Sequence, residues 1–101
     1  MSGEAAFEAL VERYTSEPDI ELRKAFSSPG LCVDGSIFAM FVRGDLVVKL
    51  PAERCAELVD AGLGTPFESG RRRMREWVTI GAGEVDRWAG LAEEALAFGR
   101  G

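Results

Sequence analysis

The sequence contains no histidine and only two cysteines. Histidine is the commonest general base at neutral pH and the usual partner of a serine or cysteine nucleophile, so its absence excludes the familiar hydrolytic arrangements. Cys32 and Cys55 lie far apart and lack the paired spacing of a zinc site. The residues therefore predict no enzymatic activity, no metal and no other cofactor.

Long apolar segments are also missing. No stretch approaches the roughly 20 apolar residues of a membrane-spanning helix. The N-terminus, MSGEAAFEALVERY, mixes acidic with apolar residues and lacks the basic start of a secretory signal. These features predict a cytoplasmic protein without membrane association. Thiols stay reduced in that compartment, so we expect Cys32 and Cys55 to be buried and to pack as small hydrophobes.

The chain has the length and composition of a single folded domain spanning residues 1–101, with 47% hydrophobic and 29% charged residues. Apolar residues recur at helical spacing in some segments and alternate with polar residues in others. The predicted helices are 3–16, 51–62 and 84–98, and the predicted strands are 20–26, 31–33, 36–42, 46–50 and 74–80. The order α-β-β-β-β-α-β-α predicts an α+β fold, with three helices packed on a mainly antiparallel five-stranded sheet.

Three local patterns refine this arrangement. Asp34-Gly35 is a strong hairpin signal, and the stretch 63–70, which contains glycine and proline, is predicted to be a loop. Strand 36–42 is apolar at nearly every position, which indicates that both of its faces are covered. Either a dimer interface or the terminal helices can supply the second cover.

Charge is distributed unevenly along an acidic chain. The 17 acidic and 12 basic residues give a net charge of −5, which disfavours general binding of nucleic acid. Residues 1–21 contain six acids and one base, whereas residues 71–83 contain four arginines and one glutamate. We therefore expect acidic helices beside basic middle strands and one basic loop.

The densest charge is the run Arg71-Arg72-Arg73-Met74-Arg75, which precedes Glu76 and Trp77. Guanidinium groups bind carboxylates and phosphates through paired hydrogen bonds. Lysines of other strands are expected on the same sheet face. The hypothetical anion-binding patch comprises Lys24, Lys49, Arg71, Arg72, Arg73, Arg75 and Trp77. Two other interpretations remain open: a solvated basic loop, or arginines that pair with acids of this chain.

Several segments, in order, resemble the TfoX/Sxy N-terminal domain family. Residues 23–40, RKAFSSPGLCVDGSIFAM, resemble the family opening RKMFGG-GL-VDGKMFA, and residues 72–78, RRMREWV, resemble GRPMKEWV. Residues 46–51 are similar to the family's L-LKLP strand end, Pro66-Phe67 to its PF loop, and residues 91–100 to its closing helix. The resemblance covers roughly residues 5–100. It implies an α+β fold related to the secretion-chaperone-like architecture, frequent dimerisation, and kinship with regulators of natural competence.

The sequence departs from the family pattern in two places. Ser27-Ser28 stands where the family has a glycine pair, which affects any role that needs close backbone approach at that turn. The chain ends at Gly101 and has no room for the second, C-terminal domain of the full competence regulators. If that domain carries the regulation, the family name does not transfer as a function.

Three hypotheses follow for the function. The favoured one is a non-enzymatic regulatory or protein-interaction domain that forms a homodimer or binds an unidentified protein partner. The second is a sensor of a small anion or nucleotide that uses the basic sheet face. The third, a DNA-associated transcriptional regulator, rests mainly on the family, because the chain is acidic and only Trp77 lies near the basic run as a stacking side chain.

Overall fold

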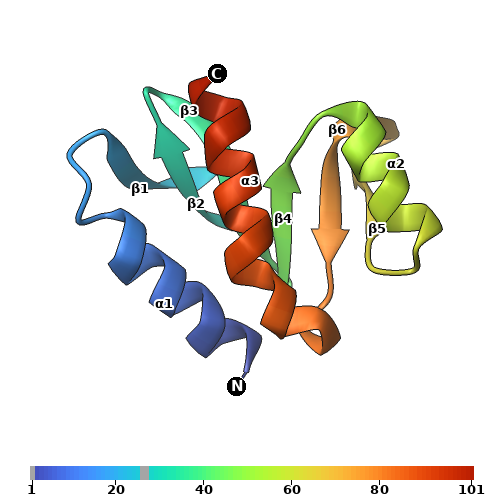
Figure 1. Ribbon diagram of the computed structural model, residues 1–101, viewed down its shortest axis with the longest axis horizontal. Coiled ribbons are helices and arrows are strands. Elements are labelled where there is room, and N and C mark those ends of the chain that lie inside the picture. Colours follow the sequence, from blue (N-terminus) through green and yellow to red (C-terminus); the bar gives the residue numbers. More distant parts are fainter. Residues whose placement is uncertain (1, 26–27) are drawn as a thin grey trace.

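Helices cover one face of a curved sheet in the computed structural model, which describes residues 2–25 and 28–101 (Figure 1). The α-helices are α1 (Gly3–Tyr14), α2 (Ala52–Asp60) and α3 (Trp88–Arg100), and a 3-10 helix, η1 (Ala82–Arg87), leads into α3. The strands are β1 (Ile20–Ala25), β2 (Ser28–Val33), β3 (Ser36–Val42), β4 (Asp45–Lys49), β5 (Thr65–Ser69) and β6 (Arg72–Ile80). The α+β class is confirmed.

The sheet has six strands in the order β1-β2-β3-β4-β6-β5, and all neighbours are antiparallel. The prediction of five strands is therefore wrong. The stretch 63–70 is not a loop but contains β5. Proline lacks the N–H that a central strand must donate, yet Pro66 fits here because β5 lies at the edge of the sheet. Residues 63–70 contain glycine and proline, which are typical of loops, so the sequence does not predict this strand.

Two tight hairpin turns connect the central strands. Asp34 and Gly35 both have positive φ, 51° and 83°, as do Arg43 and Gly44, 52° and 88°. Such turns match the twist of the strands they join, which confirms the hairpin predicted at Asp34-Gly35. β2 begins at Ser28, so part of the predicted turn before residue 31 is strand. Phe26, predicted as the end of the first strand, lies outside the described residues.

The helix ends follow recognisable capping signals. The Ser2 hydroxyl accepts a hydrogen bond from the Ala5 N–H at 3.2 Å, which starts α1. At the end of α2, Gly62 has a φ of 76°, and the N–H groups of Gly62 and Leu63 donate to the carbonyls of Val59 and Leu58. This Schellman motif confirms Gly62 as the predicted stop. The helices otherwise differ from their predicted bounds by a few residues, and the last begins as η1.

The main core lies between the helices and the sheet. Trp88 and Tyr14 are the largest side chains in it, and the indole N–H of Trp88 donates to the Gly81 carbonyl at 3.2 Å. Leu31 pairs with Ala39 and Cys32 with Ile37, so the β3 residue between them, Phe38, is a bulge. A bulge shifts the alternation of side chains, and Phe38 and Ala39 consequently both belong to the main core.

A second, smaller apolar cluster covers the opposite face of the sheet. Met40 of β3 and Val47 of β4 are almost fully buried there, and the cluster is completed by the partly buried Ile37, Val42, Phe67 and Trp77. Strand 36–42 is thus covered on both faces, as its apolar sequence predicts. Side chains of β5 and β6 cover part of the face opposite the helices. The sequence predicts a dimer interface or the terminal helices as that cover.

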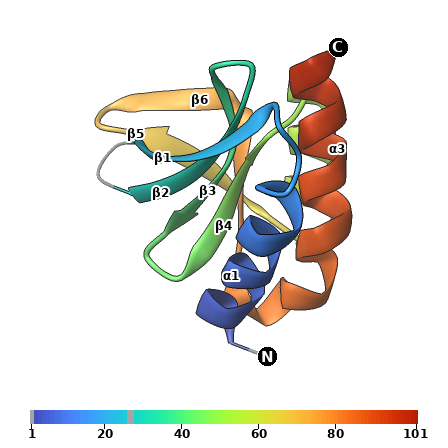
Figure 2. The ribbon, with the colours of Figure 1, turned by 90° about the vertical axis from the view of Figure 1, so that its left-hand side faces the viewer.

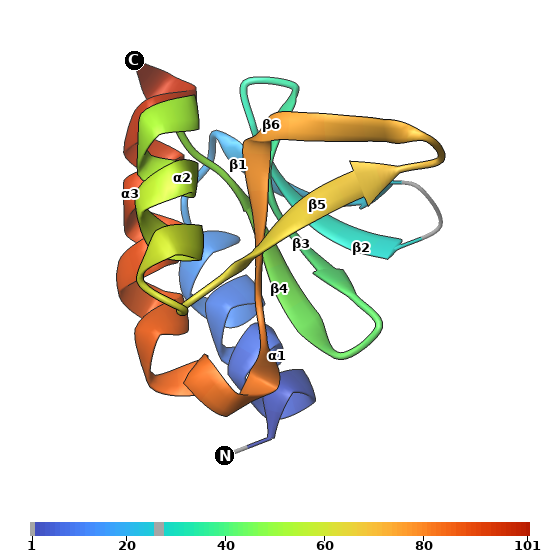
Figure 3. The same cartoon turned by 90° about the vertical axis from the view of Figure 1, so that its right-hand side faces the viewer.

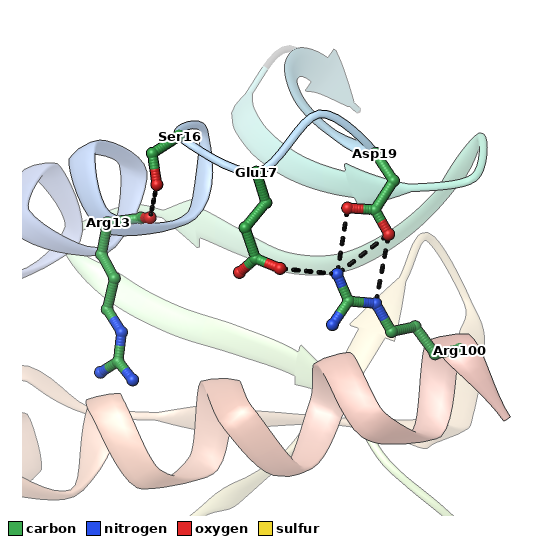
Figure 4. A network of polar contacts seen from close by, with 5 residues as sticks. All are labelled: Arg13, Ser16, Glu17, Asp19 and Arg100. Atoms are coloured by element: carbon green, nitrogen blue, oxygen red, sulfur yellow. Dashed lines mark hydrogen bonds and ion pairs between the residues drawn. The ribbon is translucent and has the colours of Figure 1, made fainter.

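An ionic network ties the α1–β1 connection to the end of α3 (Figure 4). The Arg100 guanidinium donates to Glu17 at 2.9 Å and to both carboxylate oxygens of Asp19. These hydrogen bonds raise the pKa of Arg100. The Asp19 carbonyl in turn accepts the Asp34 N–H at 3.3 Å, so the network reaches the β2–β3 turn. No helix among the described residues is long and apolar enough to cross a membrane.

Tyr14 carries a buried hydroxyl without a hydrogen-bond partner among the described residues. Its ring meets Phe38 edge to face at 5.9 Å, and burial raises the pKa of the hydroxyl. Because an unpaired polar group is costly to desolvate, Tyr14→Phe should increase the free energy of unfolding by about 0.5–1 kcal/mol. Tyr14→Ala, the control, should lose about 3–5 kcal/mol through the cavity it leaves. Urea unfolding at neutral pH measures both, and a clear loss in Tyr14→Phe would contradict the assignment.

Candidate functional site

The candidate basic residues lie where β6 changes direction. Residues 77–80 of β6 pair with β4, whereas residues 72–74 pair only with β5. Against β5 the register jumps from the pair Pro66–Val78 to the pair Phe67–Met74, which leaves residues 75–77 as an excess in β6. Extra residues in one strand bend it. Figure 3 shows the first part of β6 turning away from the helices together with β5. We call residues 67–75 the β5–β6 arm.

The bend brings most of the predicted anion-binding residues into one hollow. Lys49, at the end of β4, pairs in register with Trp77, and the Leu50 N–H donates to the Glu76 carbonyl at 2.9 Å. The hollow has a volume of about 590 Å³ and is lined by Lys49, Arg72, Arg73, Met74, Arg75, Glu76 and Trp77. Arg71 lies next to it, exposed in the turn at the tip of the arm. We call Lys49 and the four arginines the basic cluster.

Lys24 does not join the basic cluster. Side chains alternate along a strand, so Lys24 shares a face with Leu22, which lies beside α1. Lys49 points to the opposite face, with Val47 and Trp77. The expectation that Lys24 and Lys49 share a face is therefore wrong. A shift of one residue in the pairing register moves every side chain of a strand to the opposite face. In β1, IELRKA, even the apolar Leu22 is exposed, so its sequence pattern does not show which register is adopted.

The basic cluster has no acidic partner in the described part of the chain. Ion pairs there involve only other arginines: Arg13, Arg23, Arg54, Arg87 and Arg100. Glu68 is the register partner of Arg73, yet the two form no ion pair. Two acids of α3 are instead used between helices, in the bonds of Arg13 to Glu93 and of Arg54 to Glu94. Pairing with the chain's own acids thus does not account for the arginine run.

Trp77 gives the hollow an aromatic wall. Its side chain is half-buried, and its ring lies 6.4 Å from that of Phe67, in the second apolar cluster. A smaller cleft of about 270 Å³ lies between β6 and α2, with Val59 among its lining residues. It shares four lining residues with the hollow: Arg73, Met74, Arg75 and Trp77. The basic cluster therefore stands on an ordered support rather than on a free loop.

The two cysteines contribute no nucleophile to this surface. Both are buried and free, as predicted. Burial raises the pKa of the Cys32 thiol and of the Cys55 thiol, so both stay protonated at neutral pH. The Cys55 Sγ lies 3.6 Å from the Leu50 carbonyl, to which it donates. Their burial supports the interpretation that they pack as small hydrophobes.

Sequence reasoning missed a second surface feature, an apolar groove between α1 and the β1–β2 end of the sheet. It is lined by Glu4, Phe7, Glu8, Val11, Glu12, Leu22, Pro29 and Phe41. Two signals were present in the sequence: glutamates spaced four residues apart on α1, and a leucine between charged residues in β1. Neither signal shows which helix face lies beside which strand, so the groove becomes visible only in the fold.

Trp77 offers a direct test of the charge around the hollow. Trp88 is 1% exposed, so collisional quenching of tryptophan fluorescence reports mainly on Trp77. At low ionic strength, cations nearby attract iodide and repel caesium. Measured against a free neutral tryptophan derivative, the ratio of iodide quenching to caesium quenching should therefore be increased, and Arg73→Glu/Arg75→Glu should abolish the increase. The control Lys24→Glu/Arg43→Glu, which alters two cations outside the hollow, should retain it. A ratio in the unmodified protein equal to that of the free derivative would refute the assignment.

Comparison with known proteins places this arrangement in a family. No curated protein matches the chain. The family model described as TfoX N-terminal domain matches residues 12–97, which include all six strands, the bend in β6 and most of α3. The match extends over most of the 101 residues, and it agrees with the resemblance of the ordered motifs. The chain therefore belongs to the TfoX N-terminal domain family.

Proposed function

We propose that this chain is a non-enzymatic regulatory domain that binds an acidic segment of a protein partner through the basic cluster. One observation carries the proposal. On a chain with a net charge of −5, Lys49 and four arginines gather at one bend and form no ion pair with the described residues. Membership of a family that includes competence regulators supports a regulatory role.

The form of the basic cluster suits an extended partner. Arg71, Arg72, Arg73 and Arg75 are exposed along the arm, and neighbouring residues of a strand point to opposite sides. The positive charge therefore spreads along a projecting hairpin, which Figure 3 shows standing away from the helices. A carboxylate-rich segment can contact several guanidinium groups in succession, each through paired hydrogen bonds. Such contacts favour fast, salt-sensitive association.

The second candidate function is the sensing of a small anion or nucleotide. The observation in its favour is Trp77, whose half-buried ring lines the same hollow as Arg73 and Arg75 and can stack on a base. Binding of DNA is the weakest alternative, because the acidic remainder of the chain repels a phosphate backbone. Duplex DNA would be expected to bind, if at all, with steep salt dependence.

A fluorescent oligoglutamate peptide tests the proposal by anisotropy at low and moderate salt. Arg73→Glu/Arg75→Glu should raise the Kd at least about tenfold, because two charge-assisted contacts become repulsive. The matched control Lys24→Glu/Arg43→Glu changes the net charge equally at exposed cations outside the hollow and should leave the Kd within about twofold. Equal losses in the two variants would show general charge attraction and reject the site.

Thermal shift separates the two candidate functions. A ligand that binds only the folded state raises the melting temperature in a saturable way. If a nucleotide, phosphate, sulfate or small carboxylate does so, and Arg73→Glu/Arg75→Glu removes the rise, the sensor function replaces the protein-partner function. A flat response together with peptide binding supports the protein partner.

The homodimer is a further part of the proposal, and it now rests on the family resemblance alone. The surplus apolar residues of β3 are packed within one chain, against Val47, Phe67 and Trp77. These residues therefore do not need a second copy of the chain to cover them. Light scattering after size-exclusion chromatography measures the mass directly. We expect the mass of two chains at high protein concentration, and a clean monomer would reject the dimer.

A further inference from the structure

The apolar groove beside α1 has two unlike walls. Phe7 and Val11 of α1 form one wall, and Leu22 of β1, Pro29 of β2 and Phe41 of β3 form the other. The groove has a volume of about 470 Å³. Figure 2 shows β1 and β2 running outward from the sheet while α1 remains beside α3.

Aromatic contacts join the two walls of the groove. The rings of Phe7 and Phe41 stack at 5.2 Å, and Phe41 also meets the buried Trp88 edge to face at 6.3 Å. At the rim, Leu22 is 49% exposed, the one exposed large hydrophobic side chain among the described residues. The other large apolar side chains of residues 2–25 and 28–101 are at least partly buried, so this exposure marks a place where a ligand can remove apolar surface from water.

The helix wall carries a row of carboxylates. Glu4, Glu8 and Glu12 follow one another at intervals of four residues, which places them along one side of α1. None of them forms an ion pair with a described residue. Lys24, two residues beyond Leu22 on the same face of β1, is not among the residues that line the groove. The lining is thus negative along the helix and contains no basic residue.

We propose that this groove docks an amphipathic, basic helix of a partner protein. Apolar side chains on one face of such a helix would contact Leu22, Phe7 and Phe41. Lysines or arginines spaced one turn apart would lie beside Glu4, Glu8 and Glu12, whose spacing equals about one helical turn. This second surface is separate from the basic cluster and selects the opposite charge, so it goes beyond the proposed function and does not depend on it.

The test uses a synthetic leucine–lysine peptide patterned as an amphipathic helix, with anisotropy as the readout. We expect saturable binding. Leu22→Ser should raise the Kd at least about tenfold, because it removes an apolar contact with the peptide. The variant should remain folded, because Leu22 is half exposed in the free protein. Glu8→Gln/Glu12→Gln should also raise the Kd and should reduce its salt dependence. The same leucines patterned with glutamate should bind much more weakly.

A matched variant distinguishes a site from general attraction to an acidic protein. Glu53→Gln/Asp60→Asn removes the same charge from α2 at exposed residues outside the groove, and it should leave the Kd unchanged. The proposal is overturned if this variant weakens binding as much as Glu8→Gln/Glu12→Gln, if Leu22→Ser binds normally, or if the peptide does not bind. It is also overturned if sedimentation shows that Leu22→Ser converts a dimer into a monomer, because the occupant is then a second copy of this chain.

Discussion

The bend in β6 is the constraint on which both the second apolar cluster and the basic cluster of this domain depend. The last residues of β6 pair with β4 on one side and with β5 on the other, whereas its first residues pair with β5 alone. Three extra residues of β6 lie between its two stretches of pairing with β5. The excess turns the beginning of β6 out of the sheet. This turn places Phe67 and Trp77 over Met40 and Val47, and thereby closes the second apolar cluster. The same turn exposes the arginines on a projecting hairpin, so the cover of the sheet and the basic cluster have one cause.

Charge is separated over the length of the molecule. Figure 1 shows α1 and β1 at one end of the long axis and α2, β5 and β6 at the other. Three glutamates of α1 border the apolar groove, whereas the unpaired arginines gather at the arm. Between these ends, arginines of α1 and α2 are paired with glutamates of α3. The arginines that join the helices are thus paired, whereas the glutamates beside the groove and the arginines of the arm form no ion pair with the described residues.

Much of the fold follows from local sequence patterns, because local patterns report burial and turn geometry. Apolar spacing identified the inner faces of the helices, and Asp34-Gly35 and Gly62 marked a hairpin and a helix end that the backbone dihedral angles confirm. The strand β5 escaped notice because Pro66 and two flanking glycines are typical of loops. A proline is acceptable in a strand only at a sheet edge, and strand order is a property of the whole chain.

The candidate site was predicted in composition but not in arrangement. The run of arginines and Trp77 is visible in the sequence, and Lys49 joins them through pairing with β6. Lys24 does not, because its face depends on a register that no local pattern specifies. The apolar groove beside α1 is not predicted, for the same reason. Its residues come from one helix and three strands, and only tertiary packing brings Phe7 beside Phe41. A pattern within one helix or strand can be recognised in the sequence, whereas a surface formed by several helices and strands cannot.

A residue-resolved NMR titration of the isotope-labelled protein with an oligoglutamate peptide tests whether the bend in β6 assembles a binding surface. If the bend assembles a binding surface, the amide shifts should change together around Lys49 and along residues 72–77, and they should saturate with one affinity. Residues of α1 and β1 should remain unperturbed. Small, linear shifts spread over all exposed basic residues would contradict the account, since they would show that the arginines are only solvated surface charge.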